Sequence, residues 1–564
     1  MLTVAKENFL SRALLVGPAF VTALVVTNSV TDPVNNPKFV ALSVFAAAAF
    51  SVIGKGSLRF LWMNFKLPTI AILVFLIASL NSLLFSSAPF SQSLYGVYGR
   101  SNGILLYIFL SMVFISILHI SQIRTFENII RSLLIAGIIN VVYCLWVLSF
   151  GDFIGWSNPY GNILGTLGNP NFIGSFLGIF SSVVVSYCIY YFKKLKILIS
   201  LVVLTALTFF EIVQSHAIQG RVLFAVGIAI NLYFVIRAHF SYFLVQFSFM
   251  VLSGVIGIVA VLGTLQIGPL SAFLYKDSVS LRGEYWYAGL VIGKNHLLSG
   301  VGFDSYGDWY RTARRASALV RPGPNTVSNS AHNVFIDIFA FGGLPLFLGY
   351  LTINILVIFS IIRQIRLIHG FNPLFVSLVG AWVGYQIQSI ISINQIGLAI
   401  WGWILGAAIL GYERLGSLSN LSTQKSMGQI KRTIKTEPII SVTVRASILV
   451  GLTLFLSVPP LSADMKWRSA QESRDLAKIE ESLNPSYWNP SSTFKFLTTV
   501  GSIQDSNFPD IAKEYAVKAI EFNPHSYESW RAFTLLPNAT QVEKEVALKK
   551  MAELDPLNPD VTTQ

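Results

Sequence analysis

The sequence predicts an all-α, polytopic membrane protein in which about thirteen transmembrane helices precede a charged helical-repeat domain. Hydrophobic residues make up 53% of the 564-residue chain and charged residues only 12%, about half the charged fraction of soluble domains. Apolar runs of roughly 20 residues recur along the chain, and each is long enough to cross a bilayer core of about 30 Å. A single soluble domain is therefore excluded.

The first apolar run, Ala13–Val30, follows Lys6 and Arg12, as the hydrophobic part of a signal peptide would. It lacks a small-residue cleavage site and more spans follow, so we interpret it as a membrane helix. Twelve further spans are predicted at Phe39–Ile53, Leu67–Leu84, Gly103–Ile120, Ile129–Phe150, Phe172–Phe192, Leu195–Val213, Arg221–Ile236, Phe243–Gln266, Val334–Ile362, Phe371–Ile393, Ile396–Tyr412 and Arg445–Leu461.

Charge bias predicts which loops are cytoplasmic. Basic residues such as Lys55, Arg124 and Lys193 fall in alternate loops on the side of the N-terminus, and short cytoplasmic loops carry such an excess. The formal net charge of +13 is therefore interpreted as membrane topology, and no nucleic-acid partner is expected. One opposite loop, 267–331, is also basic, but long loops cross the membrane largely regardless of charge. We expect it outside.

The sequence divides into three parts. A polytopic membrane domain is predicted over residues 1–444, with the large external loop 267–331, followed by a final membrane helix over 445–461. Residues 462–564 are charged and largely helical. Because thirteen spans start from a cytoplasmic N-terminus, this last part is expected outside the cytoplasm.

The C-terminal part shows a weak repeat. Alanine-rich helices such as Ile511–Phe522 end at Asn-Pro or Asp-Pro pairs, and Pro524 and Pro556 lie 32 residues apart. Tetratricopeptide (TPR) repeats have a period of about 34 residues. We predict two divergent TPR-like helical hairpins, with a generic helical cap as the alternative.

His332 is the candidate reactive group. A polar loop ends in Ser330-Ala331-His332-Asn333 and runs directly into an apolar helix. A neutral imidazole, with an ordinary pKa near 6.5, is suited to accept the proton of a sugar hydroxyl that attacks an anomeric carbon. In the alternative interpretation His332 only marks a helix boundary, and Asn333 or Ser330 caps the helix.

Three arginines are candidate anion ligands. Arg100, Arg221 and Arg282 each lie beside a predicted helix end, and a guanidinium group engages phosphate with two hydrogen bonds at once. The diphosphate of a polyprenyl lipid is one anion that presents itself at this depth. Such a transfer needs no metal, and neither a metal site nor a cofactor is predicted. The alternative for each arginine is snorkelling at the membrane interface.

Several motifs occur together in one order. They are the Tyr98–Gly103 loop, the Gly168-Asn169-Pro170-Asn171 turn, the Gly300-Val301-Gly302-Phe303-Asp304 turn, and His332-Asn333 followed nine residues later by Gly342-Gly343. Together with the order of spans and the long loop before the tenth, this pattern resembles the O-antigen ligase and Wzy-type polymerase superfamily over about residues 60–412. Each motif is unspecific alone, whereas their order and spacing are more specific.

The resemblance implies a metal-independent GT-C-type glycosyltransferase at the outer face of a bacterial cytoplasmic (inner) membrane. Its donor would be an undecaprenyl-diphosphate-linked oligosaccharide, and its acceptor a glycan, a lipid or a protein. By the same resemblance His332 would activate the acceptor hydroxyl, and Arg282 and Arg221 would hold the diphosphate. Supporting positions would be Asn333, Gly302, Asn169 and Asn171.

One position departs from the family pattern. Members of the superfamily often carry a Ser-Arg pair after the seventh span, whereas this chain has Ser215-His216, with Arg221 five residues later. Because of this departure His216 is added to the candidate site, and the diphosphate-binding role is assigned less firmly to Arg221 than to Arg282.

Two rival functions are considered. A polysaccharide flippase or transporter would place ionisable groups near the bilayer midplane and often shows internal repeats. Here the predicted spans are nearly free of charge, and the polar, glycine-rich loops lie on one side. A membrane-anchored repeat scaffold would leave those loops unexplained. Ligase and polymerase activities remain open alternatives within the enzyme hypothesis.

Overall fold

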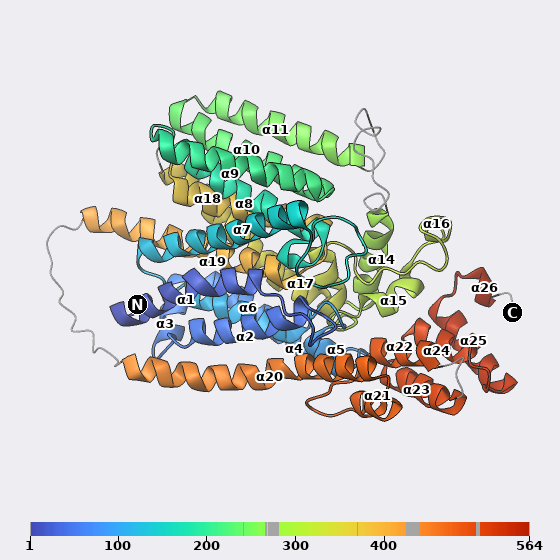
Figure 1. Cartoon of the computed structure of the whole chain (residues 1–564). Helices are drawn as coiled ribbons and strands as arrows, with labels where there is room; N and C mark the ends of the chain where they lie inside the picture. The colour runs from blue at the N-terminus through green and yellow to red at the C-terminus, as the bar shows by residue number, and fades with distance from the viewer. Residues whose placement is uncertain are drawn as a thin grey trace.

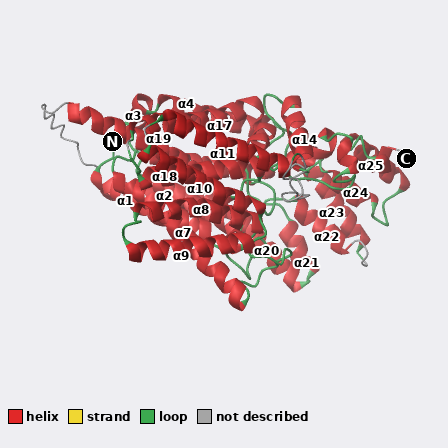
Figure 2. Cartoon of the chain, turned by 90° about the horizontal axis from the view of Figure 1, so that it is seen from above, coloured by secondary structure: helices red, strands yellow, loops and turns green. Residues whose placement is uncertain are grey.

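The computed structural model describes residues 2–240, 242–264, 268, 281–368, 370–424, 439–503 and 508–562. Within these ranges the chain forms helices and loops without a β-sheet, which confirms the all-α prediction (Figure 2). Long helices lie side by side in one bundle, and the C-terminal helices gather at one end of it (Figure 1). The predicted external loop covers residues 267–331. Its first part, residues 267–280, lies outside the described residues except for Gly268.

Nine helices within the described ranges are long and apolar enough to cross a membrane, so the chain is a multi-pass membrane protein. Two other apolar helices, α6 (Ile104–Ile117) and α11 (Phe243–Thr264), offer shorter apolar stretches in the described residues. The nine are α4 (Lys66–Phe85), α7 (Ile123–Phe150), α8 (Pro170–Tyr190), α9 (Leu195–Gln214), α10 (Ile218–His239), α17 (Val334–Leu367), α18 (Pro373–Ile391), α19 (Ile396–Gln424) and α20 (Ile439–Ser473).

The first helix differs from the predicted span Ala13–Val30. α1 runs over Val4–Ala23, and the Thr3 side chain accepts a hydrogen bond from the Lys6 backbone N–H at its start. The charged first turn stays inside the protein because the buried Glu7 accepts backbone hydrogen bonds at the start of α7. Apolar content alone therefore placed this helix too late in the chain.

The helix that follows His332 is broken in two. At Gly342-Gly343 the backbone of α17 leaves helical geometry, with Gly343 at φ 66°. The Val301 N–H donates to the Ala340 carbonyl at 2.9 Å, and the Gly302 N–H donates to the Phe341 carbonyl at 3.1 Å. Broken helices are tolerated in membrane proteins where other groups satisfy the freed backbone. The Gly-Val-Gly turn thus holds the loop preceding His332 against the break.

Gly302 fits this turn because it lacks a side chain. Its φ is 102°, and a Cβ placed there would lie 2.4 Å from the Ala88 Cβ. We expect Gly302→Ala to destabilise the protein by about 2–4 kcal/mol, from backbone strain and overpacking together. Gly99→Ala is the matched control, because Gly99 has φ 80° but nothing within 4 Å of the added Cβ. Thermal unfolding in detergent should separate the variants, and equal losses in both would contradict a packing role for Gly302.

The last membrane helix continues into the C-terminal domain. α20 extends unbroken to Ser473, beyond the predicted boundary at residue 461, and its Trp467 is buried in the core of the domain. The apolar run ends before the helix does, so the sequence predicted the end of this membrane helix too early. The remaining helices are α21 (Leu476–Leu483), α22 (Thr493–Ile503), α23 (Pro509–Phe522), α24 (Tyr527–Thr534), α25 (Gln541–Leu554) and α26 (Pro559–Thr562).

These helices pack as neighbours along the chain. α22 contacts α23, α23 contacts α24, and α24 contacts α25, as in stacked helical hairpins. The predicted end of one helix at Phe522 is confirmed, and Asn523 follows it outside helical geometry. Assignment to tetratricopeptide repeats remains a prediction.

Candidate functional site

His332 lies immediately before the first turn of α17. The helix is capped by Asn333, whose side chain accepts from the backbone N–H groups of Phe335 at 3.0 Å and Ile336 at 3.2 Å. The backbone of His332 is left-handed, at φ 52°, and its N–H donates to the Ser330 hydroxyl at 2.8 Å. Asn333 therefore serves as the cap, which leaves the imidazole of His332 free of that role.

Asp337 organises the loop in front of His332. Its carboxylate accepts from the Ala331 N–H at 2.7 Å and from the Ser330 hydroxyl at 3.1 Å. The same Ser330 oxygen receives the His332 N–H. Asp337 thus positions the backbone of the candidate base and makes no hydrogen bond to its ring, in keeping with its place about 140° around the helix.

The surroundings of His332 keep its imidazole neutral. Burial, together with the positive charges of Arg282 and Arg100, lowers the pKa of His332 to about 4. Its ring centroid lies 5.6 Å from that of Tyr285 on α14 (Arg282–Asn295). At neutral pH the imidazole can therefore accept a proton.

Arg282 is a buried cation, and the part of the chain that the structure describes supplies no carboxylate to pair with it. It is the first residue of α14 and is 6% exposed. Among the described residues it forms no ion pair, and its Nε atom is buried without an acceptor. Burial lowers the pKa of Arg282 to about 10, which still leaves it charged at neutral pH. Because a buried charge is costly unless paired, this site favours an anionic ligand.

Arg100 also acts electrostatically on His332, but its guanidinium already forms an ion pair with a carboxylate. Its guanidinium lies 2.9 Å from the Asp304 carboxylate and donates to the Asn329 carbonyl. Asp304 is buried, has a left-handed backbone at φ 56°, and accepts from the Val97 N–H at 2.9 Å. Asp304 was part of the predicted turn motif, but its pairing with Arg100, about 200 residues away in the chain, could not be read from spacing.

The other predicted residues form a separate group at the start of α8 and α10. These two helix starts lie together, because the Ser175 hydroxyl donates to the Gln219 side chain at 3.1 Å. Arg221 and His216 are exposed, and no hydrogen bond or ion pair within the described chain connects Arg221 with His332. Their role in the site stays a prediction.

In the same group Asn169 caps α8. Its side chain accepts from the Asn171 N–H at 2.8 Å and donates to the Tyr160 hydroxyl at 3.1 Å. The Gly168-Asn169-Pro170-Asn171 turn therefore has a structural role in starting this helix.

Two arginines of the loop contact the C-terminal domain. Arg311 and Arg314 lie 2.9 and 2.7 Å from the buried carboxylate of Asp555, and Arg311 also lies 2.8 Å from Glu528. Arg315 pairs with Glu284 instead. Sequence reasoning missed Asp555, because its Asp-Pro pair was interpreted only as a helix end.

An apolar groove begins beside the candidate base. It has a volume of about 470 Å³ and runs between α14, α17 and α18. All of its lining residues except Asn333 are apolar, and Asn333 is the chain neighbour of His332. The lining consists of Leu290, Asn333, Phe335, Ile336, Phe339, Leu344, Phe347 and Ile390.

Comparison with protein-family models and with curated protein sequences finds no match to this chain. Within the described ranges, no group of three His, Cys, Asp or Glu side chains is arranged to hold a metal ion. The assignment of function therefore depends on the geometry around His332 and on the motifs of the sequence.

Proposed function

We propose that this protein is a glycosyltransferase of the O-antigen ligase or polymerase type. It transfers an oligosaccharide from undecaprenyl diphosphate to an acceptor at the outer face of a bacterial cytoplasmic membrane. The observation that carries the proposal is a partly buried, neutral His332 beside Arg282, a buried guanidinium that has no carboxylate partner among the described residues. A base and an anion site therefore adjoin at the start of a membrane helix.

The chemistry follows from these two groups. The imidazole of His332 accepts the proton of the acceptor hydroxyl as that oxygen attacks the anomeric carbon. The bond between this carbon and the diphosphate oxygen breaks, and the diphosphate leaves with the bonding electrons. Arg282 stabilises the charge that develops on the leaving group.

The apolar groove supports a lipid-linked donor. A polyprenyl chain needs an apolar path that ends where its diphosphate is bound. Asn333, the chain neighbour of His332, is the one polar residue that lines the groove between α14, α17 and α18. A soluble nucleotide-sugar donor would have no use for such a path.

The predicted topology completes the proposal. Thirteen spans would be the nine long helices together with α1, α2 (Asn35–Phe50), α6 and α11. They would place the loop with His332 and the C-terminal domain on the extracytoplasmic side. Lipid-linked oligosaccharides are consumed there, and α14, which begins at Arg282, lies at the same end of the bundle as the C-terminal helices (Figure 1).

Purified protein in lipid nanodiscs with a labelled undecaprenyl-diphosphate oligosaccharide and candidate acceptors tests this function. We expect Arg282→Ala to lower kcat/KM by about 100-fold or more, because it removes a buried electrostatic partner of the leaving group. Arg315→Ala is the matched control, since Arg315 belongs to the same loop but is 48% exposed and paired with Glu284. Donor movement between leaflets without any transfer product would instead support a flippase and contradict the enzyme.

The depressed pKa of His332 predicts an unusual pH profile. A base is active when deprotonated, so kcat/KM should stay level from pH 8 to about pH 5.5 and fall only near the pKa of about 4. An ordinary histidine would lose activity near pH 6.5. A bound diphosphate favours the imidazolium, so the acid limb of kcat should lie at higher pH than that of kcat/KM. An acid limb of kcat/KM near pH 6.5 would contradict this environment.

A further inference from the structure

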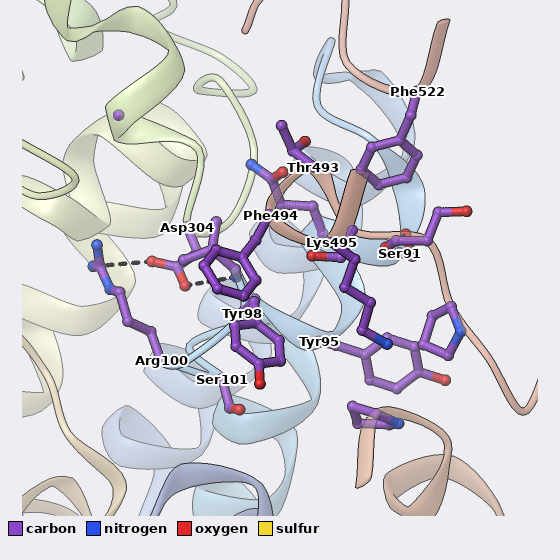
Figure 3. Close-up of a pocket in the computed structure, with 18 of the residues that line it drawn as sticks. Ser91, Tyr95, Tyr98, Arg100, Ser101, Asp304, Thr493, Phe494, Lys495 and Phe522 are labelled. Atoms are coloured by element: carbon purple, nitrogen blue, oxygen red, sulfur yellow. Dashed lines mark hydrogen bonds and ion pairs between the residues drawn. The ribbon is translucent and has the colours of Figure 1, made fainter. Parts of the chain in front are cut away.

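A second cavity lies where the membrane domain meets the C-terminal domain. Its volume is about 400 Å³, within the range of about 300–1,000 Å³ typical of small-molecule sites. Tyr98, Arg100 and Asp304 line it from the membrane-domain loops, and Thr493 and Phe494 line it from the C-terminal domain (Figure 3). Both domains therefore build this cavity.

An aromatic pair forms one wall of the cavity. The rings of Tyr98 and Phe494 stack with centroids 4.6 Å apart and an angle of 5° between their planes. The Tyr98 hydroxyl donates to the buried Asp464 at 2.6 Å, which fixes the inner ring in place. Phe494 is 46% exposed, so one side of the pair is available to a ligand.

The charged groups of the wall are balanced within the protein. Arg100 pairs with Asp304, and Glu528 pairs with Arg311. Two further charges of opposite sign line the cavity: Asp308 accepts a hydrogen bond from the Gln92 side chain at 2.9 Å, and the Lys495 ammonium group donates to the Ala463 carbonyl at 2.9 Å. Such a wall offers hydrogen bonds without a large net charge, and it differs in this respect from the surroundings of Arg282.

Unused hydrogen-bonding groups remain on the same wall. The Thr493 hydroxyl and the Arg100 Nε atom are buried and have no hydrogen-bond partner among the described protein atoms. Buried polar groups are normally satisfied, and a ligand with hydroxyl groups would satisfy these. The cavity is also lined by Asn329, which lies three residues before His332 in the chain and whose carbonyl accepts a hydrogen bond from Arg100.

We infer that this cavity binds the acceptor substrate and that the acceptor is an uncharged glycan. An aromatic face packs against the C–H face of a sugar ring, while polar groups around it bind hydroxyls. The role of the cavity as an acceptor site rests on the proposed glycosyl transfer. Binding of a glycan in the cavity requires neither the donor nor His332. The C-terminal domain thus supplies part of the acceptor site.

An array of neutral oligosaccharides, acidic oligosaccharides and peptides, probed with the full-length protein in nanodiscs, tests the inference. We expect saturable binding to neutral glycans, which Phe494→Ala weakens at least tenfold and Thr493→Val weakens severalfold. Phe508→Ala is the matched control and should bind like the wild type. Phe508 is 47% exposed, belongs to the same domain and does not line the cavity.

The outcomes separate this inference from the proposed function. Preferred binding of acidic glycans or peptides, the absence of neutral-glycan binding, or binding unaffected by Phe494→Ala would each overturn the acceptor site. A His332→Asn variant should retain neutral-glycan binding while it loses transfer. Retention of transfer in that variant would remove the proposed base and leave the binding result intact.

Discussion

Replacement of His332 by asparagine is expected to lower kcat for glycan transfer by about 10²–10⁴-fold, the usual contribution of a general base. Asparagine is the informative substitution because the backbone at position 332 is left-handed, at φ 52°, and asparagine tolerates this conformation better than most residues. The Ser330 hydroxyl should continue to accept the backbone N–H at this position. The variant therefore removes the base and preserves the local fold.

The kinetic pattern distinguishes a base from a structural residue. Because His332 acts on the acceptor proton in the transition state, kcat and kcat/KM should fall together, whereas donor binding should change little. The acid limb near pH 4 should also disappear from the residual rate. Unchanged kcat in a folded His332→Asn protein would remove His332 from the mechanism.

Local patterns allowed the sequence to predict the helices and the start of the site. Apolar runs located most spans, and the Asn333 cap marked the start of α17. Ends set by tertiary contacts were missed. α1 begins early because Glu7 is satisfied by the start of α7, and α20 extends through Trp467 into the second domain.

Long-range pairing explains what the sequence could not predict about the site. Arg100, Arg311 and Arg282 look alike in a sequence, as cations beside helices. The structure pairs Arg100 with Asp304 and Arg311 with Asp555, whereas Arg282 keeps no carboxylate among the described residues. Of these three arginines, Arg282 alone is uncompensated within the described part of the chain, and spacing along the chain cannot reveal this difference.

Backbone strain also gathers around the candidate base. Ser101, Asp304 and His332 have φ of 55°, 56° and 52°, values that non-glycine residues rarely adopt. Left-handed conformations cost about 1–2 kcal/mol each and often occur at functional sites. Nothing in the sequence indicates that the backbone is left-handed at these three positions, because none is a glycine. Their location beside Arg100 and Arg282 is consistent with a site selected for geometry over stability.

Asp555→Asn is expected to weaken docking of the C-terminal domain by about 3–5 kcal/mol, since removing one partner leaves buried charges uncompensated. Arg311 and Arg314, 2% and 4% exposed, would both lose the Asp555 carboxylate, and Arg311 would keep only its pair with the exposed Glu528. Hydrogen exchange should then increase along α24 and α25, and limited proteolysis should cut the domain earlier. Transfer should fall as well, because Phe494 would no longer be held against Tyr98.

Glu528→Gln provides the control for Asp555→Asn. Glu528 binds the same Arg311 at 2.8 Å but is 44% exposed, so this pair should contribute less than about 1 kcal/mol. Equal effects of the two variants would mean that the buried pair does not hold the domains together. If replacing Arg311, Arg314 and Asp555 together by Met, Met and Leu restores protection from exchange, the ion cluster serves docking only. Glycan transfer would then recover together with the protection from exchange, because the cavity wall depends on the position of the C-terminal domain and not on these charges.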